Sequence, residues 1–395
     1  MNILIINTHL SGGGAAIAAR RLRDAFSMMP EVSVAFLSLE KKSLRDRLNF
    51  VAERAEIFLY NGFRKEKIFH ISTALWGRDI SSHPLVKWAD VIHLHWMNHG
   101  MISLKGLERL AKMGKPVFWT THDMWPFTAV SPHLSDPNRY ESPWTGKENS
   151  SLVQRVWDIK HRIYPLLRPS FICCTEWIAG KARESELTQG LEITTIPNTI
   201  DTSLFSPPTL FSTEQKRIVV GAVQTDDPRK GFNELLSALH RLPLREMNVV
   251  VDIFGNLSPK ASALLESLPV VFHGYISSEK EMIELYRSAY MLVVPSLFEN
   301  LPCTIMESLS CGTPVVAFET GGIPEMVQSG ENGLLAKYAD HADLADKIAE
   351  MLRLPHSQYQ AMRRAAREKA VSCYSYERVA QQHIALYTSK LNGKP

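Results

Sequence analysis

Residues Met291–Phe318 read MLVVPSLFENLPCTIMESLSCGTPVVAF, and this stretch contains one complete strand–helix–strand unit. An apolar run ends at Ser296, a polar loop follows, and Pro302 stands in the first turn of a helix, where proline is tolerated. We expect the helix to extend over about Thr304–Cys311, because Gly312 and a proline soon after it end the helix. Two apolar strands joined by a helix are typical of a parallel sheet that is covered on both faces.

The same alternation of apolar strands and amphipathic helices recurs along the chain. The expected strands of the first half are NILIIN, VSVAFLSL, DVIHLHW, PVFWTTH, FICCT and ITTIP, and those of the second half are RIVVGAV, NVVVDIFG, VVFHGY, MLVVPS, TPVVAF and GLLAK. This pattern predicts the α/β class, with two Rossmann-like, doubly wound domains. A segment rich in Ser, Thr and Pro, DTSLFSPPTLFSTEQK, separates the two sets of strands.

We place the domains at residues 1–205 and 206–375, followed by a final helix over residues 376–395 that packs back toward the first domain. Ligands of doubly wound sheets bind beyond the carboxyl ends of the strands. We therefore expect the functional site in a cleft across which the two domains face each other.

The composition indicates an ordinary globular protein. Of the 395 residues, 45% are hydrophobic and 22% are charged, and the net charge of +3 is too small to indicate a nucleic-acid partner. The five cysteines show neither a metal-ligand spacing nor an even-numbered framework, which favours reduced thiols in the cytosol. The start MNILIINTHLSGGG lacks the basic region of a signal peptide, and no run of about 18 apolar residues occurs. We expect a soluble, cytoplasmic protein.

Two glutamates, Glu299 and Glu307, stand eight residues apart in a stretch that otherwise resembles a buried core. Glu299 falls on the loop at the end of a strand, and Glu307 falls about one turn into the helix. Between them, the helix start near Asn300 and Leu301 offers backbone N–H groups without intrahelical partners. This arrangement suits a sugar and a ribose that flank a diphosphate. The alternative is one acid favoured by the helix dipole and one surface acid.

Two further segments place glycines or cations where a helix begins, which suits an anionic ligand. In INTHLSGGGAAIAARRL, three glycines, Gly12–Gly14, separate a strand from a helix. They are not the dinucleotide fingerprint, because Ile17 stands where a third spaced glycine is needed. In GAVQTDDPRKGFNELLSAL, Arg229–Gly231 lie where the next helix begins, and a bound phosphate would offset their unfavourable charges. The alternative for the three glycines is a tight turn without a ligand, and the alternative for Arg229 and Lys230 is an exposed basic pair on a loop.

Histidines follow two neighbouring strands. His122 and Asp123 end the strand PVFWTTH, where His122 suits a hydrogen bond to a sugar hydroxyl or a role as general base. A structural histidine that caps the loop is the alternative. His93, His95 and His99 end the preceding strand, but no carboxylate ligand accompanies them, so a metal site there is disfavoured.

Together, these stretches resemble the family-4 retaining glycosyltransferases, which adopt the GT-B fold. Glu299 and Glu307 form the E-x7-E pattern of that family. The resemblance covers nearly the whole chain, in family order, through the glycine-rich turn and the segments THDMWPFT, CTEWIAGKARESEL, IPNTIDTSLF, RKGF, ENLPCTIMESLSCGTPVVAFETGGIPE and ENGLL. It implies two Rossmann-like domains facing each other across a cleft, with the C-terminal helix crossing back to the first domain.

The resemblance also implies roles for the residues already singled out. Glu307 would bind the ribose hydroxyls of the donor, and Lys230 would bind the leaving diphosphate. Glu299 would lie beside the transferred sugar, close to the backbone amides that follow it. The catalytic residues implied are Glu299, His122 and Lys230, and the donor-binding residues implied are Gly13, Gly14, Arg229, Lys230, Asn300, Leu301 and Glu307.

The first domain contributes its glycine turn and its histidine in this scheme. Gly13 and Gly14 would approach the diphosphate and the sugar, and His122 is similar to the sugar-contacting histidine of the family. One position departs from the family: Gln224 stands where many members carry an arginine, and a neutral amide cannot replace a guanidinium that binds phosphate. We expect Arg229 to supply that charge.

The reaction implied is the transfer of a sugar from a nucleotide diphosphate sugar to a hydroxyl of a glycan or lipid-linked acceptor. The anomeric configuration would be retained, and the setting would be cell-surface polysaccharide or lipopolysaccharide biosynthesis. No cofactor and no metal are expected, since the chain has no D-x-D pattern and no cysteine cluster after HDMWPFT. A nucleotide-sugar epimerase of the same fold and an inactive sugar-binding relative are the alternatives.

The segment from Lys41 to Lys67 contains eight Lys or Arg and four Asp or Glu residues, mixed with apolar side chains. A basic amphipathic helix of this kind can rest on an anionic membrane and reach a lipid-linked glycan. The hypothesis is a peripheral contact with the cytoplasmic face of the inner membrane, and the alternative is a solvated helix face.

Overall fold

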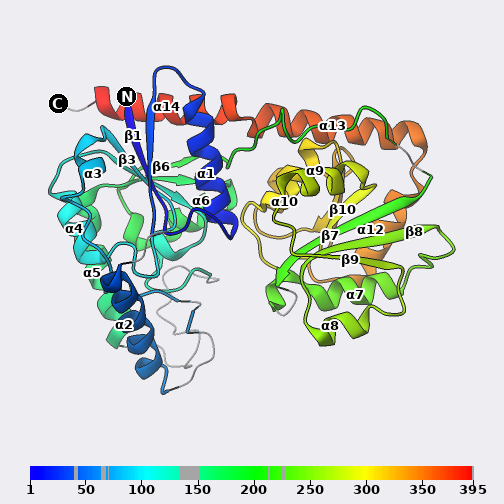
Figure 1. The fold of residues 1–395 in the computed structure, drawn as a ribbon, viewed down its shortest axis with the longest axis horizontal. Helices are drawn as coiled ribbons and strands as arrows, with labels where there is room; N and C mark the ends of the chain where they lie inside the picture. The colour runs from blue at the N-terminus through cyan, green and yellow to red at the C-terminus, as the bar shows by residue number, and fades with distance from the viewer. Residues whose placement is uncertain are drawn as a thin grey trace. The chain divides into compact units, whose positions relative to one another are not determined.

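The computed structural model describes residues 1–39, 43–63, 68–69, 71–133, 151–211, 214–224 and 227–393, except for the side chains of residues 222–224 and 260. The chain divides into two compact units, which are Met1–Thr199 together with Val379–Pro395, and Ile200–Arg378. We refer to them as the N-terminal unit and the C-terminal unit (Figure 1). Each unit is built on one six-stranded sheet.

The sheet of the N-terminal unit has the strand order β2-β1-β3-β4-β5-β6, and its strands pair in parallel. Its strands are β1 (Asn2–Ile6), β2 (Ser33–Leu37), β3 (Val91–Leu94), β4 (Val117–Thr121), β5 (Ser170–Cys173) and β6 (Ile193–Thr195). The helices that accompany them are α1 (Gly14–Ser27), α2 (Leu44–Tyr60), α3 (Pro84–Trp88), α4 (Leu104–Ala111), α5 (Ser151–Leu167), α6 (Glu176–Glu184) and α14 (Tyr376–Asn392), with the 3-10 turns η1 (Trp125–Phe127) and η2 (Glu186–Thr188). The winding direction reverses between β1 and β3, where sheets of this kind place ligands.

The sheet of the C-terminal unit has the order β12-β11-β10-β7-β8-β9, and its strands also pair in parallel. Its strands are β7 (Lys216–Gln224), β8 (Val249–Asn256), β9 (Val270–Gly274), β10 (Met291–Val294), β11 (Val315–Phe318) and β12 (Gly333–Ala336). Its helices are α7 (Phe232–His240), α8 (Pro259–Leu264), α9 (Glu279–Ser288), α10 (Cys303–Ser310), α11 (Ile323–Met326), α12 (His341–Arg353) and α13 (His356–Tyr374), with the 3-10 turn η3 (Pro228–Lys230). Every strand expected from the sequence is present, so the prediction of two doubly wound α/β units is confirmed.

The stretch Met291–Phe318 forms the expected unit of β10, α10 and β11, and every residue of the two strands is buried. The helix begins one residue earlier than expected. Pro302, with an extended ψ of 126°, is the N-cap, and Cys303 is the first helical residue. Gly312, with a φ of 70°, follows the last turn as expected, because glycine adopts the left-handed conformation that ends many helices.

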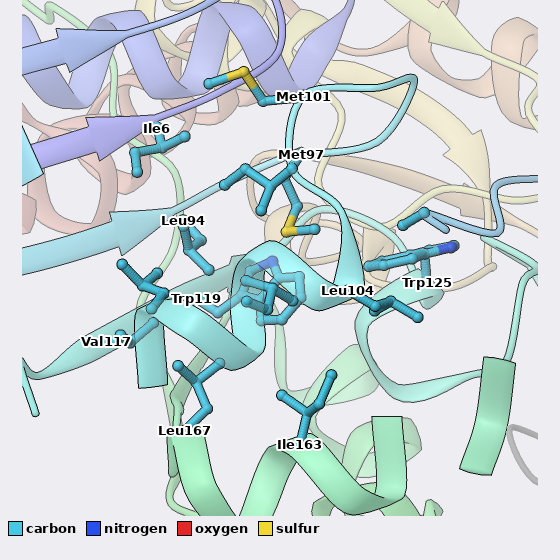
Figure 2. Packing of buried hydrophobic residues seen from close by; sticks show 14 of the residues in the cluster. Ile6, Leu94, Met97, Met101, Leu104, Val117, Trp119, Trp125, Ile163 and Leu167 are labelled. Carbon is cyan, nitrogen blue, oxygen red and sulfur yellow. The ribbon is translucent and has the colours of Figure 1, made fainter. Parts of the chain in front are cut away.

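The core of the N-terminal unit lies between its sheet and α5. Figure 2 shows Val117 and Trp119 of β4 on the side that α5 covers with Ile163 and Leu167. The indole N–H of Trp119 donates to the carbonyl oxygen of His95 at 3.0 Å. The packing of β4 therefore also fixes the end of β3, which carries two of the expected histidines.

Helix α14 packs on the N-terminal sheet through an aromatic cluster. The Tyr387 hydroxyl lies 2.7 Å from Nδ1 of the buried His93. The Tyr387 ring also lies 4.5 Å from the ring of Phe118 and 6.0 Å from that of Phe26, between ring centroids. The end of the chain is thus held by a buried hydrogen bond as well as by apolar contacts.

Replacing Tyr387 with phenylalanine should lower the free energy of unfolding of the N-terminal unit by about 1–3 kcal/mol, because it leaves Nδ1 of His93 buried without its partner. Urea denaturation followed by circular dichroism measures this change. Tyr338→Phe is the matched control, since Tyr338 is 59% exposed and should unfold like the wild type. Equal stability of Tyr387→Phe and the wild type would contradict the proposed importance of this hydrogen bond.

Candidate functional site

The point where the C-terminal sheet reverses its winding, between β7 and β10, brings together two predicted site residues. Lys230 ends the turn η3 after β7, and Glu299 lies on the loop after β10. The Lys230 Nζ atom donates to Oε1 of Glu299 at 2.5 Å. The side chain of Lys230 is 36% exposed and that of Glu299 is 15% exposed, so the pair faces solvent mainly through the ammonium group. A pair this exposed contributes only about 0–1 kcal/mol to stability.

Two glycines allow the chain to pass close to the loop that carries Glu299. Gly231 has a φ of 64°, and a Cβ there would lie 1.8 Å from the carbonyl oxygen of Pro295. Gly321 has a φ of 55°, and a Cβ there would lie 1.8 Å from the carbonyl oxygen of Glu299. Gly322 also donates its N–H to that oxygen at 3.1 Å. Only glycine fits at residues 231 and 321. Sequence reasoning assigned no role to Gly321, although it lies in the segment FETGGIPE.

Arg229, expected to meet a phosphate, is paired within its own turn. Its guanidinium donates to both carboxylate oxygens of Asp227, at 3.1 and 2.7 Å, and its backbone N–H donates to Oδ1 at 3.0 Å. Burial alone would raise the pKa of Asp227, but the bonds and charge of Arg229 outweigh it and lower that pKa below its usual value. Arg229 would have to leave this pair to bind a phosphate. The side chain of Gln224 lies outside the described part of the chain.

The start of α10 and Glu307 follow the Glu299 loop in the chain. Glu307 is buried, and its Oε2 accepts a hydrogen bond from the Tyr286 hydroxyl of α9 at 2.9 Å. Asn300 and Leu301 lie directly before the helix, as expected. The first turn of α10 has no capping side chain and no acidic residue, so no side chain of that turn offsets the positive end of the helix dipole.

The glycine turn of the N-terminal unit is open to solvent. Gly12 and Gly13 both have a φ of 82°, a conformation that favours glycine, and Gly13 is the N-cap of α1. Gly14 has no such need, since its φ is ordinary and a Cβ there would meet nothing within 4 Å. Because α1 has no side-chain cap, the turn presents a helix N-terminus that small residues leave accessible.

His122 contacts a second histidine rather than standing alone. Its Nε2 lies 2.9 Å from Nδ1 of His95, and its Nδ1 lies 3.9 Å from the Cys174 sulfur. Burial lowers the pKa of His122 to about 4. An imidazole with this pKa is neutral near pH 7 and is a weak base, which favours a hydrogen-bonding role over that of a general base. His122, His95 and Asp123 line the same small pocket.

Two further buried histidines, His93 and His383, lie beside the pair of His95 and His122. The rings of His93 and His95 lie 4.4 Å apart, and those of His93 and His383 lie 5.6 Å apart, between centroids. His93 also contacts the Thr120 hydroxyl at 2.7 Å. Among the described residues, no group of three or more His, Cys, Asp or Glu side chains could hold a metal ion. Sequence reasoning missed His383, because it lies in the last helix, 290 residues after His93 (383 − 93).

Comparisons with known proteins cover both halves of the chain. Residues 210–369 match the family model described as glycosyl transferases group 1. The chain is 28% identical over 294 residues to MMP alpha-(1->4)-mannosyltransferase of Mycolicibacterium hassiacum, which covers 71% of this chain and 67% of that protein. It is 31% identical over 193 residues to D-inositol 3-phosphate glycosyltransferase of Corynebacterium jeikeium, which covers 42% of this chain and 46% of that protein.

Two solved structures share the architecture of the whole chain. Sucrose-phosphate synthase of Thermosynechococcus elongatus superposes with a TM-score of 0.69 at 16% identity, over 100% of both chains. HepE of Anabaena, solved in complex with UDP and glucose, superposes with a TM-score of 0.63 at 17% identity, over 98% of this chain and 99% of that chain. At these identities the likeness shows the fold, which is that of GT-B glycosyltransferases, and confirms that expectation.

The N-terminal unit should lose stability as the pH falls from about 6.5 to about 4. Burial lowers the pKa values of His122 and His383 to about 4 and those of His93 and His95 well below their usual value. The unfolded chain binds protons near pH 6.5 and the folded chain does not, so acid favours unfolding by up to about 1.4 kcal/mol per pH unit for each histidine.

Urea denaturation at about pH 7, 6 and 5 measures this loss. His383→Gln should make the free energy of unfolding less dependent on pH, because one of the buried histidines is removed. His161→Gln, at an exposed position, is the control and should leave the slope unchanged. A free energy of unfolding that does not vary over this range would show that the cluster takes up protons in the folded state.

Proposed function

Because residues 210–369 match the family model of the glycosyl transferases group 1, we propose that the chain is a retaining enzyme that uses a nucleotide diphosphate sugar as donor. The acceptor would be a hydroxyl of a glycan or of a lipid-linked glycan, in the biosynthesis of a cell-surface polysaccharide or lipopolysaccharide. The observation that carries the proposal is the Lys230–Glu299 pair beside the N-terminus of α10. It combines a cation from the turn after β7, a carboxylate from the loop after β10 and the helix that follows that loop.

These groups match the charges of the transfer reaction. As the bond from the anomeric carbon to the diphosphate breaks, negative charge develops on the diphosphate, and Lys230 and the start of α10 would stabilise it. A well-placed donor of this kind contributes roughly 3–4 kcal/mol to transition-state stabilisation. Glu299 would accept hydrogen bonds from hydroxyls of the transferred sugar. Because this scheme meets the diphosphate charge with protein groups, it uses no divalent metal and no cofactor.

Glu307 fits the ribose of the donor nucleotide. A ribose offers two hydroxyl donors, and a carboxylate such as that of Glu307 can accept several hydrogen bonds, of which Tyr286 provides one. The Tyr286 hydroxyl also fixes which way this carboxylate points. The complex of HepE with UDP and glucose supports a nucleotide-sugar donor for proteins of this fold. Contacts of Gly13, Gly14 and His122 with the donor sugar and diphosphate remain predictions from the resemblance.

Glu299→Ala and Lys230→Ala should each reduce sugar transfer by at least about a hundredfold, because Lys230 would stabilise the leaving diphosphate and Glu299 would hold the transferred sugar. UDP-, GDP-, ADP- and dTDP-sugars are first screened with the wild type, and the product anomer is assigned by NMR. Glu331→Ala and Lys337→Ala, exposed residues of the same unit, are the matched controls. Wild-type turnover in both site variants would refute the assignment, and isomerised donor without an acceptor would identify an epimerase.

Glu299→Gln should separate donor binding from transfer. The Glu299 carboxylate neutralises Lys230 and would repel a phosphate, so the amide of Glu299→Gln should strengthen binding of the nucleoside diphosphate by about threefold to tenfold. Sugar transfer should nevertheless fall. Isothermal titration with the diphosphate of the preferred base measures the first effect, with Glu331→Gln as control. Weaker binding in Glu299→Gln would mean that Glu299 positions Lys230 for the phosphate rather than competing with it.

A further inference from the structure

Helix α2 has its polar and apolar faces reversed relative to an ordinary surface helix. Its buried residues are Asp46, Glu53, Arg54 and Ile57, of which three are charged. Its exposed apolar residues are Leu44 at 75%, Leu48 at 60%, Val51 at 59% and Leu59 at 59%. A surface helix normally turns its apolar stripe inward and its charges outward. The reversal needs both an explanation for the buried charges and a partner for the exposed side chains.

The buried charges are held by specific contacts of the N-terminal unit. Asp46 bonds the guanidinium of Arg78 and accepts from the backbone N–H of Ser43 at 2.7 Å. Glu53 Oε1 accepts from the Ser72 hydroxyl at 2.6 Å and from two successive backbone N–H groups, those of residues 73 and 74, at 2.9 Å. These contacts fix the rotation of α2 about its axis, so its apolar face is turned outward by the fold itself.

The exposed side chains form a single stripe. Leu44, Leu48, Val51, Ala55 and Leu59 follow one another at spacings of three and four, which places them on one face; we call them the outer stripe. At about 100° per residue, two arginines lie on opposite sides of this stripe. They are the exposed residues at positions 45 and 47. Basic side chains beside an apolar stripe are typical of helices that lie in a membrane interface.

The charge around the outer stripe is positive. Two of the four acids between Lys41 and Lys67, Asp46 and Glu53, are turned inward, whereas Arg45 and Arg47 are turned outward. A third acid of the helix, Glu56, accepts a hydrogen bond from the Thr73 hydroxyl at 3.0 Å. A second copy of this chain would bring two cationic surfaces together, which is unfavourable. An anionic bilayer would accept the apolar side chains and offset the charge.

We propose that the outer stripe of α2 inserts into the surface of an anionic lipid bilayer, with Arg45 and Arg47 at the headgroups. Among the described residues, no helix is long and apolar enough to cross a membrane, which fits a helix lying along the surface. Figure 1 shows α2 at an edge of the N-terminal unit, beside α5. This inference goes beyond the proposed transfer reaction and does not depend on it, because it concerns another surface. It would bring the protein to acceptors that are anchored in lipid.

Co-sedimentation with vesicles tests the proposal. The full chain should pellet with vesicles of phosphatidylcholine and phosphatidylglycerol at low salt, and far less with phosphatidylcholine alone. Leu48→Ser/Val51→Ser should weaken binding by roughly tenfold or more, because two inserted side chains become polar. Arg45→Gln/Arg47→Gln should weaken it by about tenfold, and this loss should shrink at high salt. Leu210→Ser is the matched control, since Leu210 is 89% exposed in the C-terminal unit.

The outcomes separate the possible occupants of the stripe. Wild-type pelleting by both double variants, or no binding of the wild type to anionic vesicles, would refute the proposal. A dimer in analytical ultracentrifugation that both double variants abolish would assign the stripe to a second copy instead. Urea midpoints confirm that each variant is folded. Titration with a nucleoside diphosphate should give the same affinity in these variants, so failure at the membrane surface and failure at the donor site are distinguishable.

Discussion

The geometry of the candidate donor site depends on the absence of side chains at Gly231 and Gly321. Their Cβ atoms would lie 1.8 Å from the carbonyl oxygens of Pro295 and Glu299, and both residues have positive φ values. The loop after β10 therefore lies between two segments that approach its backbone directly. Because this approach leaves little freedom to the loop, Glu299 is held where Lys230 can reach it. The position of the Lys230–Glu299 pair follows from this close packing of backbone.

The Lys230–Glu299 contact contributes little to stability, and under the proposed function its role is ligand exchange. An ion pair with a partly exposed ammonium contributes about 0–1 kcal/mol to folding, so giving it up costs little. A doubly charged phosphate would be a stronger partner for Lys230 than one carboxylate. Glu299 would then be left close by with acceptor capacity for sugar hydroxyls. Arg229 differs, since Asp227 meets it with both oxygens and its own turn depends on that contact.

The sequence predicted the fold well because its information is local. Continuous apolar runs such as that of β10 specify buried parallel strands, and Pro302 and Gly312 mark the limits of α10. The topology of parallel strands also placed Lys230 and Glu299 at the same sheet edge, although they are 69 residues apart. Pairings that depend on tertiary packing were not predictable. The contact of His95 with His122, and the arrival of His383 beside His93, depend on where α14 lies, and no pattern within either segment encodes it.

Helix α2 shows most clearly what a sequence pattern does not predict. A helical period identifies two faces but not which of them is buried, and hydrophobicity alone would turn Leu48 and Val51 inward. The fold reverses this choice because Glu53 caps backbone N–H groups near Ala74, a residue with the strained φ of 47°. Strain of about 1–3 kcal/mol and a buried carboxylate are costs that a purely structural helix would not need. In α2, the local rules that are broken together coincide with the apolar stripe between arginines, which is the surface that the membrane proposal uses.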